Sequence, residues 1–317
     1  MDVAFTISIQ PGTSTQHALD YQDTNTAGGV ASHATQENRQ AFVTFGDASW
    51  GSVKLGKDLG IYASDAILND MTLLGVGSGA GALVGNTTTL GRIGTGYIYA
   101  DWKPQIAYTS PNFNGFSFTA GVTQAWNADT STGRGGSSPA FEGKASYAFA
   151  GDVSGKVWAS GITQKVEGIA TTAVGDATAT SHAWDLGANV NMAGFGLTGY
   201  YGEGKGLGTV GQFAGAFDSL GAKRDSKDWY TQATYTLPGV GTKLGVAYGE
   251  SKLEGNTVDT YNDLTNDMWT FGAYHPLTKH LNLVAEYSDV TTKADSKSGT
   301  DTSTTGKTVS LGAILFF

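Results

Sequence analysis

The 317-residue chain contains no cysteine, only 6 prolines and only 15% charged residues. Without cysteine there are no disulfides, no thiol catalysis and no cysteine metal sites. Charged residues make up about 25% of an ordinary soluble domain, so this sequence is poor in them. The formal net charge is −9, which argues against a nucleic-acid partner because binding phosphates requires basic patches.

Long hydrophobic runs are also missing. No stretch of about 18 apolar residues occurs, and the longest charge-free candidate, Met71 to Gly91, is too rich in Gly and Thr to predict a spanning helix. No signal peptide is recognisable, since the chain opens directly on an alternating strand at Val3. We therefore expect that an exported form has already lost its leader.

Signatures of catalysis are lacking as well. The five histidines show no HExxH spacing, and there is no G-x-S-x-G elbow. The glycine-rich stretch Gly75 to Gly81 is not surrounded by a βαβ unit, as a dinucleotide-binding loop would be. These absences predict a protein that is not an enzyme and that has no cofactor.

What the sequence does have is glycine, 46 in number, 11% aromatic residues, and an alternation of apolar and polar residues along its whole length. In the clearest stretch one face carries Trp184, Leu186, Ala188, Val190 and Met192, and the other carries Asp185, Gly187, Asn189 and Asn191. A period of two predicts strands and not helices. The last stretch, Gly306 to Phe317, keeps an apolar face to its final residue, and such a face needs an apolar neighbour, either a protein core or lipid.

The connections between these stretches alternate between short and long. Short ones lie near residues 46–49, 111–115, 151–155, 192–194, 238–241 and 276–279. Long ones cover about 11–37, 58–98, 127–140, 163–181, 202–227, 251–265 and 289–306. Between them we count about 14 strands of roughly eight to thirteen residues, a pattern typical of outer-membrane β-barrels.

A soluble all-β sandwich is the alternative fold. Sandwich strands are usually shorter, about five or six residues, and both of their inner faces are apolar. Here the second face is Ser, Thr, Asn, Gln, Gly, Lys and Asp, which suits water. Aromatic residues lie near strand ends on the apolar face, where membrane girdles belong: Trp184, Trp229, Trp269, Tyr108, Tyr235 and Tyr287. We therefore expect one transmembrane antiparallel β-barrel domain over residues 1–317, whose terminal Phe317 faces lipid.

Several stretches resemble the general diffusion porins of Gram-negative outer membranes. They are "RQAFVTFGDASWGSVKLGKDLG" from Arg39, "SDAILNDM" from Ser64, "LGRIGTGYIYADWKPQIAYTSPNFNGFSF" from Leu90 and "YHPLTKHLNLVAEYS" from Tyr274, together with the terminal Phe317. The resemblance runs from residue 39 to the end and is weak in the middle. It implies a trimeric 16-stranded barrel in the bacterial outer membrane, with membrane lipid and lipopolysaccharide as neighbours. It also implies a C-terminal assembly signal, Phe317, for the barrel-assembly machinery.

Two departures from the family pattern matter. The segment that resembles the infolded constriction loop, 58–98, follows the third strand here and the fifth in the family. The first hairpin is therefore missing, and the chain is either a truncated form of a 16-stranded protein or a native 14-stranded barrel. In addition, a second loop acid expected four residues after Asp70 is replaced by Leu74, which predicts a weaker transverse field.

The resemblance assigns Asp70 and Asp65 to the constriction loop and Arg92 and Arg39 to the facing arginine cluster. We expect Asp65 and Asp70 to project into the bore. Arg92 can equally be a structural arginine that pairs the loop with the wall, and Arg39 has lipid-face parity in the alternation. Lumen parity is predicted for Lys54, which we place at the constriction, and for Lys144, Asp185, Lys243 and Glu286. For each of these the alternative is a solvated wall residue with little influence.

The function predicted from these features is passive diffusion of ions and small hydrophilic solutes through a water-filled channel, because charged side chains around a bore set selectivity without covalent chemistry. The alternatives are a channel specific for a sugar or small organic acid, and a structural or enzymatic barrel. The acidic composition suggests a mild cation preference, against which Arg39, Arg92 and Lys54 act. Loop acids can also hold divalent cations.

Overall fold

The computed structural model describes residues 1–8, 10–12, 35–76, 91–126, 138–172 and 175–317. Fourteen strands form one antiparallel sheet, and a small second sheet pairs β2 (Gln10–Gly12) with β3 (Thr35–Glu37). The strands of the large sheet are β1 (Asp2–Ile7), β4 (Ala41–Asp47), β5 (Gly51–Leu59), β6 (Trp102–Thr109), β7 (Phe116–Thr123), β8 (Ala140–Phe149), β9 (Val153–Ile169), β10 (Ala177–Met192), β11 (Phe195–Lys205), β12 (Asp225–Thr236), β13 (Lys243–Glu254), β14 (Tyr261–Pro276), β15 (Leu281–Ser296) and β16 (Thr302–Leu315).

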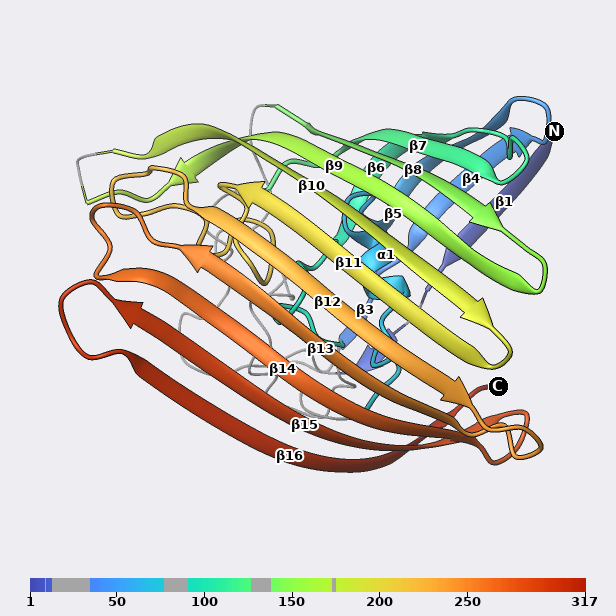
Figure 1. Ribbon diagram of the computed structural model, residues 1–317. Coiled ribbons are helices and arrows are strands. Elements are labelled where there is room, and N and C mark those ends of the chain that lie inside the picture. The colour runs from blue at the N-terminus through green and yellow to red at the C-terminus, as the bar shows by residue number, and fades with distance from the viewer. Residues whose placement is uncertain (9, 13–34, 77–90, 127–137, 173–174) are drawn as a thin grey trace.

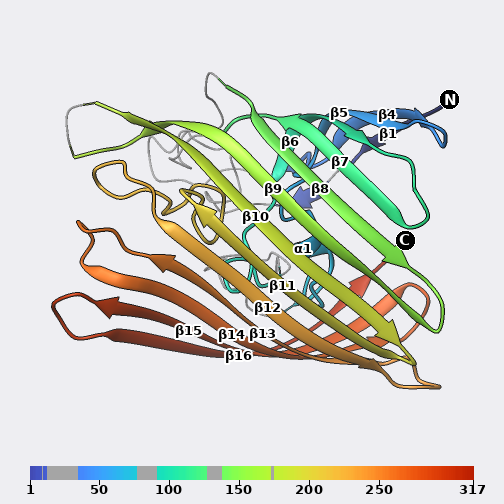
Figure 2. The same ribbon diagram turned by 45° about the horizontal axis from the view of Figure 1, so that its top comes forward.

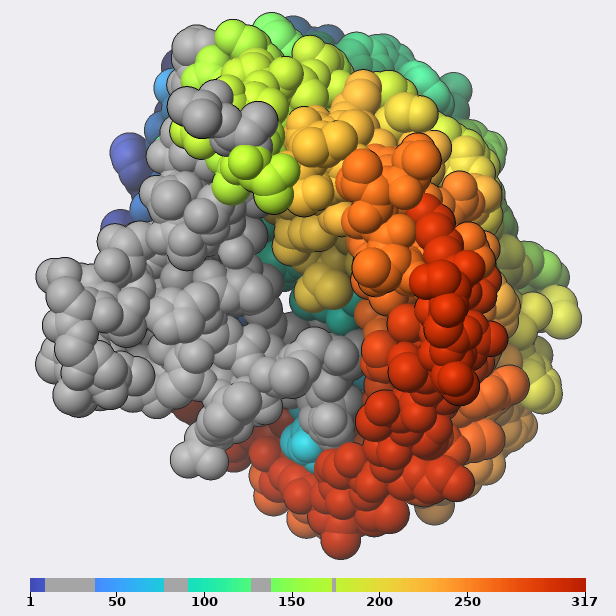
Figure 3. Space-filling model, turned by 90° about the vertical axis from the view of Figure 1, so that its left-hand side faces the viewer, coloured from blue at the N-terminus to red at the C-terminus, as the bar shows by residue number. Residues whose placement is uncertain are grey.

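The sheet is a meander, in which each strand pairs with the strand that follows it in the large sheet. The strands are tilted and the sheet curls around an interior that holds the described residues between β5 and β6 (Figures 1 and 2). Both termini lie at the end where the connections are short. Viewed from the opposite end, the strand ends form an arc around a hollow (Figure 3). The predicted architecture of a curled antiparallel sheet with unequal ends is confirmed.

The two faces of the sheet differ as the alternation predicts. On the outer face Leu186, Leu197 and Phe271 are 49%, 59% and 51% exposed, although all three are large and apolar. Neighbouring inward positions such as Asp185 and Thr198 are only 1% and 3% exposed, because the segment inside the sheet covers them. An apolar exterior and a polar interior are the reverse of a soluble protein and are typical of a barrel in lipid.

Several strands are longer than predicted. β9, β10, β14 and β15 span 16 or 17 residues, and much of the segments 163–181 and 289–306 is paired strand and not loop. At these strand ends the outward residues are polar, such as Thr163 and Lys165 in β9 and Asp289 and Thr291 in β15, so the outward apolar alternation that marks a strand disappears while the backbone ladder continues. The prediction of long loops there was wrong for that reason.

The sheet has two edges, β1 and β16, and no ladder joins them among the described residues. Edge backbone groups cannot be satisfied by lipid, so a closed ring requires partners for both edges. A 14-stranded ring closed by β1 and β16, one of the two alternatives, is not formed by these strands.

One short helix, α1 (Ser64–Leu68), lies inside the curled sheet. It follows Ala63, which has a left-handed backbone with φ of 61°. Nowhere in the described part of the chain is a helix long and apolar enough to cross a membrane.

Candidate functional site

The described residues between β5 and β6, 60–76 and 91–101, are folded inside the sheet, and we call them the inner loop. Its two ends are joined by a hydrogen bond from the Gly60 amide to the Asp101 carbonyl, 2.6 Å long. The prediction placed this segment at 58–98. At Gly75 a Cβ would overlap Glu286 Oε1, so any larger residue would displace that carboxylate.

The inner loop is held to the wall by several hydrogen bonds, which we call pins. Gln232 on β12 accepts from the Met71 amide at 2.9 Å and donates to the Asn69 carbonyl at 2.7 Å. The Tyr230 hydroxyl donates to the Ala66 carbonyl at 2.8 Å. Further pins reach β13 from Gly96 and β15 from Val76. The loop therefore crosses the inner wall from β8 to β15.

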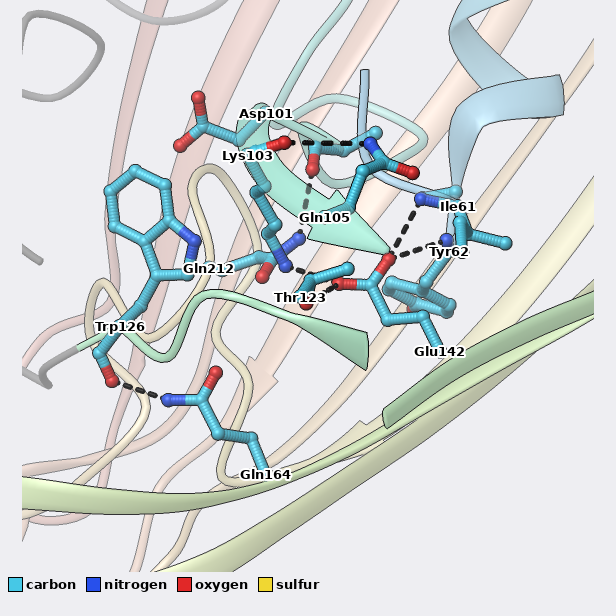
Figure 4. A network of polar contacts seen from close by, with 12 residues as sticks. Ile61, Tyr62, Asp101, Lys103, Gln105, Thr123, Trp126, Glu142, Gln164 and Gln212 are labelled. Carbon is cyan, nitrogen blue, oxygen red and sulfur yellow. Dashed lines mark hydrogen bonds and ion pairs between the residues drawn. The ribbon is translucent and has the colours of Figure 1, made fainter. Parts of the chain in front are cut away.

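One end of the inner loop is anchored by a buried ion pair (Figure 4). The Lys103 ammonium lies 2.5 Å from Glu142 Oε1, and both side chains are 0% exposed. Glu142 Oε2 accepts from the amides of Ile61 and Tyr62 at 2.8 and 2.9 Å, and Thr123 donates to Oε1 at 2.9 Å. A buried pair of charges persists only where such additional hydrogen bonds satisfy it.

Asp70 forms a second anchor within the loop. Its Oδ1 accepts from the amide and hydroxyl of Thr72, both at 2.9 Å, and its Oδ2 accepts from the Arg92 amide at 3.1 Å and the Tyr97 hydroxyl at 2.7 Å. The Arg92 guanidinium points away from this carboxylate toward β14 and donates to the Met268 carbonyl at 2.7 Å. Asp70 is 5% and Arg92 0% exposed.

These contacts correct one expectation. Asp65 and Asp70 were expected to project into the bore, but both side chains are buried. A carboxylate that attracts backbone amides and hydroxyls gains more from them than from open water when the loop packs against a wall. For Arg92 the contacts match the alternative reading, a structural arginine that pairs loop with wall.

A cluster of lysines surrounds Asp65 on α1. Lys144 on β8 donates to Asp65 Oδ2 and to the Ser64 hydroxyl, both at 3.0 Å, and Lys156 on β9 donates to Asp65 Oδ1. Asp65 belongs to the loop and not to a spanning strand. Burial alone would raise its pKa, but the two ammonium groups outweigh burial and hold the pKa below the ordinary carboxyl value. We call Asp65, Lys144 and Lys156 the lysine cluster.

The other predicted site residues are dispersed. Lys54 pairs with Asp58 four residues later on β5. Arg39 precedes β4 by two residues, a strand-end position that explains its parity. The Lys243 ammonium lies 5.1 Å from the centre of the Tyr274 ring. Glu286 accepts from the Tyr274 hydroxyl at 2.7 Å and the Val76 amide at 2.9 Å, and Asp185 is buried near Tyr200.

The structure brings Asp65 together with Lys144, and Asp70 together with the Arg92 backbone. It does not set loop acids against Arg39 and Arg92 across a bore. Phe317 is fully exposed beyond the end of β16.

A second connection, residues 206–224 between β11 and β12, also folds inward, which the sequence reading missed. Its Val210 carbonyl accepts from the Tyr99 amide at 2.9 Å, and Gln212 donates to the Ala100 carbonyl at 3.1 Å. Leu207 and Phe213 join a buried cluster with Tyr62 and Trp126. The apolar residues Leu207 and Phe213 in an otherwise glycine-rich loop were the available signal.

At the outer end of this second loop, Arg224 forms a clamp with Asp259 of the β13–β14 connection. The guanidinium donates two hydrogen bonds to the carboxylate, at 2.8 and 2.6 Å, and a third at 2.9 Å to the Gly215 carbonyl. The hydrogen bonds from Arg224 hold the pKa of Asp259 below its ordinary value.

A cavity of about 540 Å³ opens between the end of α1 and the inner wall near the short connections. Uncharged polar side chains dominate its wall, and Lys243 and Asp152 lie at its margin. The rest of the polar lining comprises Asn69, the buried Asp70, Ser154, Asn189, Asn191, Gln232, Thr234 and Thr236. In the described part of the chain no group of three or more His, Asp or Glu residues is arranged to hold a metal ion.

Important residues at this site escaped sequence reasoning. Glu142 and Lys103 were not singled out, although Glu142 shares inward parity with Lys144 two residues later. Lys156 likewise lies on the inward face of β9, as does Trp158 two residues later. Parity was thus the usable signal, whereas which inward residues meet the loop depends on long-range packing. Two aromatic residues on inward positions, Trp158 and Tyr230, are only 4% and 1% exposed.

Comparisons with known proteins agree on the fold. The outer membrane channel DcaP of Acinetobacter baumannii superposes with a TM-score of 0.66 at 14% identity, over 99% of this chain and 80% of that one. The trimer form of OmpT, an outer membrane protein of Vibrio cholerae, gives 0.54 at 15% identity, over 89% and 80%. OprB of Pseudomonas putida gives 0.54 at 11% identity, over 99% and 83%. Comparison with curated protein sequences finds no match.

The sequence model of the Gram-negative porin family matches residues 1–295, which is most of the chain. This match agrees with the apolar exterior, the meander of 14 strands and the segment folded inside the sheet. The chain therefore belongs to the Gram-negative porin family and forms an outer-membrane β-barrel channel for passive diffusion.

Proposed function

We propose that the inner loop, residues 60–76 and 91–101, is the constriction of this channel, and that small hydrophilic solutes and ions pass between it and the uncovered part of the wall. The observation that carries the proposal is the set of pins from the loop to β12, β13 and β15, which hold it across the interior. A loop held in this way narrows a passage that 14 or more strands would otherwise leave wide.

The proposal is tested by single-channel recording in a planar bilayer. We expect stable, ohmic current steps from the folded chain. Gln232→Ala removes two pins and should raise the conductance or the current noise, whereas Thr231→Ala on the outward face of the same strand should leave both unchanged. Absence of current from folded protein would refute the channel, and equal behaviour of the two variants would refute the role of the loop.

We further propose that the chain assembles as a homotrimer in contact with lipid and lipopolysaccharide, and that Phe317 is read by the barrel-assembly machinery. The trimer form of the OmpT structure supports the first statement, and the exposed apolar outer face supports contact with lipid. Chemical cross-linking in native membranes tests the trimer, and deletion of Phe317 tests the assembly signal through the amount of folded protein.

We infer that the chain has no catalytic role, since its family and fold are those of channels. A sugar-specific channel is less well supported, because the candidate aromatic residues Trp158 and Tyr230 are covered by the inner loop. Divalent-cation binding by loop acids stays a prediction.

A further inference from the structure

The acids and the lysines of the inner wall differ in their access to water. Every carboxylate that the inner loop touches or covers is below 10% exposed. These residues are Asp58 at 7%, Asp65 at 4%, Asp70 at 5%, Glu142 at 4%, Asp185 at 1%, Asp228 at 5% and Glu286 at 4%. Most of them accept hydrogen bonds from amides, hydroxyls or ammonium groups, whose positive ends face the carboxylate and oppose its field.

The lysines that pair with these acids stay in contact with water. The side chains of Lys144 and Lys156 are 23% and 32% exposed, whereas the side chain of Asp65, which both of them contact, is 5% exposed. The two ammonium groups share the Asp65 carboxylate, and the nearby Asp185 is only 1% exposed, so the groups of this region that reach water toward the bore are positive. Lysine exposes its terminal charge while its alkyl stem packs on the wall, which explains the asymmetry.

Lys243 adds a third positive charge on the other side of the cavity beneath α1. Its side chain is half-buried beside the Tyr274 ring and forms no ion pair in the described part of the chain; the Asp70 carboxylate lines the same cavity but is only 5% exposed. Between Lys156 and Lys243 the wall is uncharged. Across the strand pairs, Lys156 lies opposite Asn189, Asn189 lies opposite Thr198, and Thr198 lies opposite Gln232. Lys243 lies opposite Thr236, which is on the same strand as Gln232.

We propose that this channel prefers anions, and that Lys144, Lys156 and Lys243 are the residues that set the preference. A small anion, such as chloride or a short carboxylate, would pass the lysine cluster, cross the hydrogen-bonding wall of Asn189 and Gln232, and meet Lys243. The inference rests on the proposed function. It reverses the mild cation preference that the acidic composition suggests, because composition counts buried and exposed charges alike.

Asp152 is the one exposed carboxylate that lines the cavity. It lies in the short turn before β9, at the margin of the passage. It opposes the lysines there, so its removal should act in the opposite direction to theirs.

The test is the reversal potential in a bilayer across a roughly tenfold KCl gradient, because charged side chains around a bore set ion selectivity. We expect wild type to favour chloride over potassium. Lys156→Gln and Lys243→Gln should each lower the chloride-to-potassium permeability ratio about twofold, since one unit charge acts on a passing ion through a high dielectric. Asp152→Asn should raise the ratio.

Lys227→Gln is the matched control, because it removes the same charge from the outer face, where Lys227 pairs with Glu254. It should leave the ratio unchanged. A wild-type preference for potassium, or lysine variants that conduct with the wild-type ratio, would overturn the inference. The wild-type measurement needs no variant to fold. Conductance with the wrong selectivity refutes only this inference, whereas no conductance refutes the proposed function.

Discussion

Two lysine–carboxylate clusters on neighbouring positions of β8 have different roles. Glu142 and Lys144 both point inward, two residues apart. Glu142 is sealed with Lys103 at 0% exposure and binds backbone amides of the inner loop. Lys144 meets Asp65 at the bore and keeps its ammonium partly in water. A lysine–carboxylate pair thus anchors the loop where both side chains are buried, and it supplies charge to the passage where the lysine is in contact with water.

The largest effect is expected for Glu142→Gln, which tests whether the buried pair stabilises the protein. It leaves the Lys103 ammonium buried without its counter-charge, which typically costs about 3–5 kcal/mol. We expect a large fall in unfolding free energy, measured by denaturant titration of the folded barrel in detergent. Glu167→Gln, which removes an exposed partner of Lys165, is the control, and an equal loss in both variants would contradict the role of burial.

Asp70→Asn should have the next largest effect. The carboxylate oxygens accept four hydrogen bonds, whereas an amide side chain offers one oxygen and presents donors to the remaining partners. Leaving buried donors unpaired costs about 1–3 kcal/mol. We expect a moderate loss of stability and noisier single-channel currents. A shift in selectivity with an unchanged noise level would show instead that Asp70 acts on passing ions.

The clamp between Arg224 and Asp259 is intermediate in burial and should respond to acid. Because the folded pKa of Asp259 is depressed, its stabilising contribution is complete above the ordinary carboxyl pKa of about 3.9 and is lost as pH falls through the lower folded value. We expect channel fluctuations to increase only below about pH 4. In Asp259→Asn they should be present at neutral pH and independent of acid, and fluctuations in that variant that still rise with acid would contradict this assignment.

Lys144→Gln should affect stability least. Its ammonium is partly hydrated, and Lys156 still pairs with Asp65 when Lys144 is removed, so no buried charge is left without a partner. We expect near-wild-type denaturation together with a lower chloride-to-potassium ratio. A stability loss as large as that of Glu142→Gln would contradict the distinction between the partly exposed Lys144–Asp65 pair and the buried Lys103–Glu142 pair.

Much of the fold followed from alternation. Inward and outward positions on β10 and β16 were correct from the period of two, and the inner loop was recognised by its resemblance to the constriction loop of the porin family. The long ends of β9 and β15 were missed, since their outward residues are polar and the apolar alternation on that face ends there. At the site, parity placed Lys144 and Lys243 inward, but two partners of Asp70, Arg92 and Tyr97, lie 22 and 27 residues away and leave no local pattern.

The sequence by itself determined which side of each strand meets lipid and which meets the interior, because the side-chain period of a strand is two and lipid accepts only apolar groups. Tertiary structure alone decided which interior charges are covered. The inner loop covers Glu142 and Glu286 and buries its own Asp70, whereas Lys144, Lys156 and Lys243 stay partly exposed. That choice depends on contacts between segments far apart in the chain, and the charge offered to a solute depends on it.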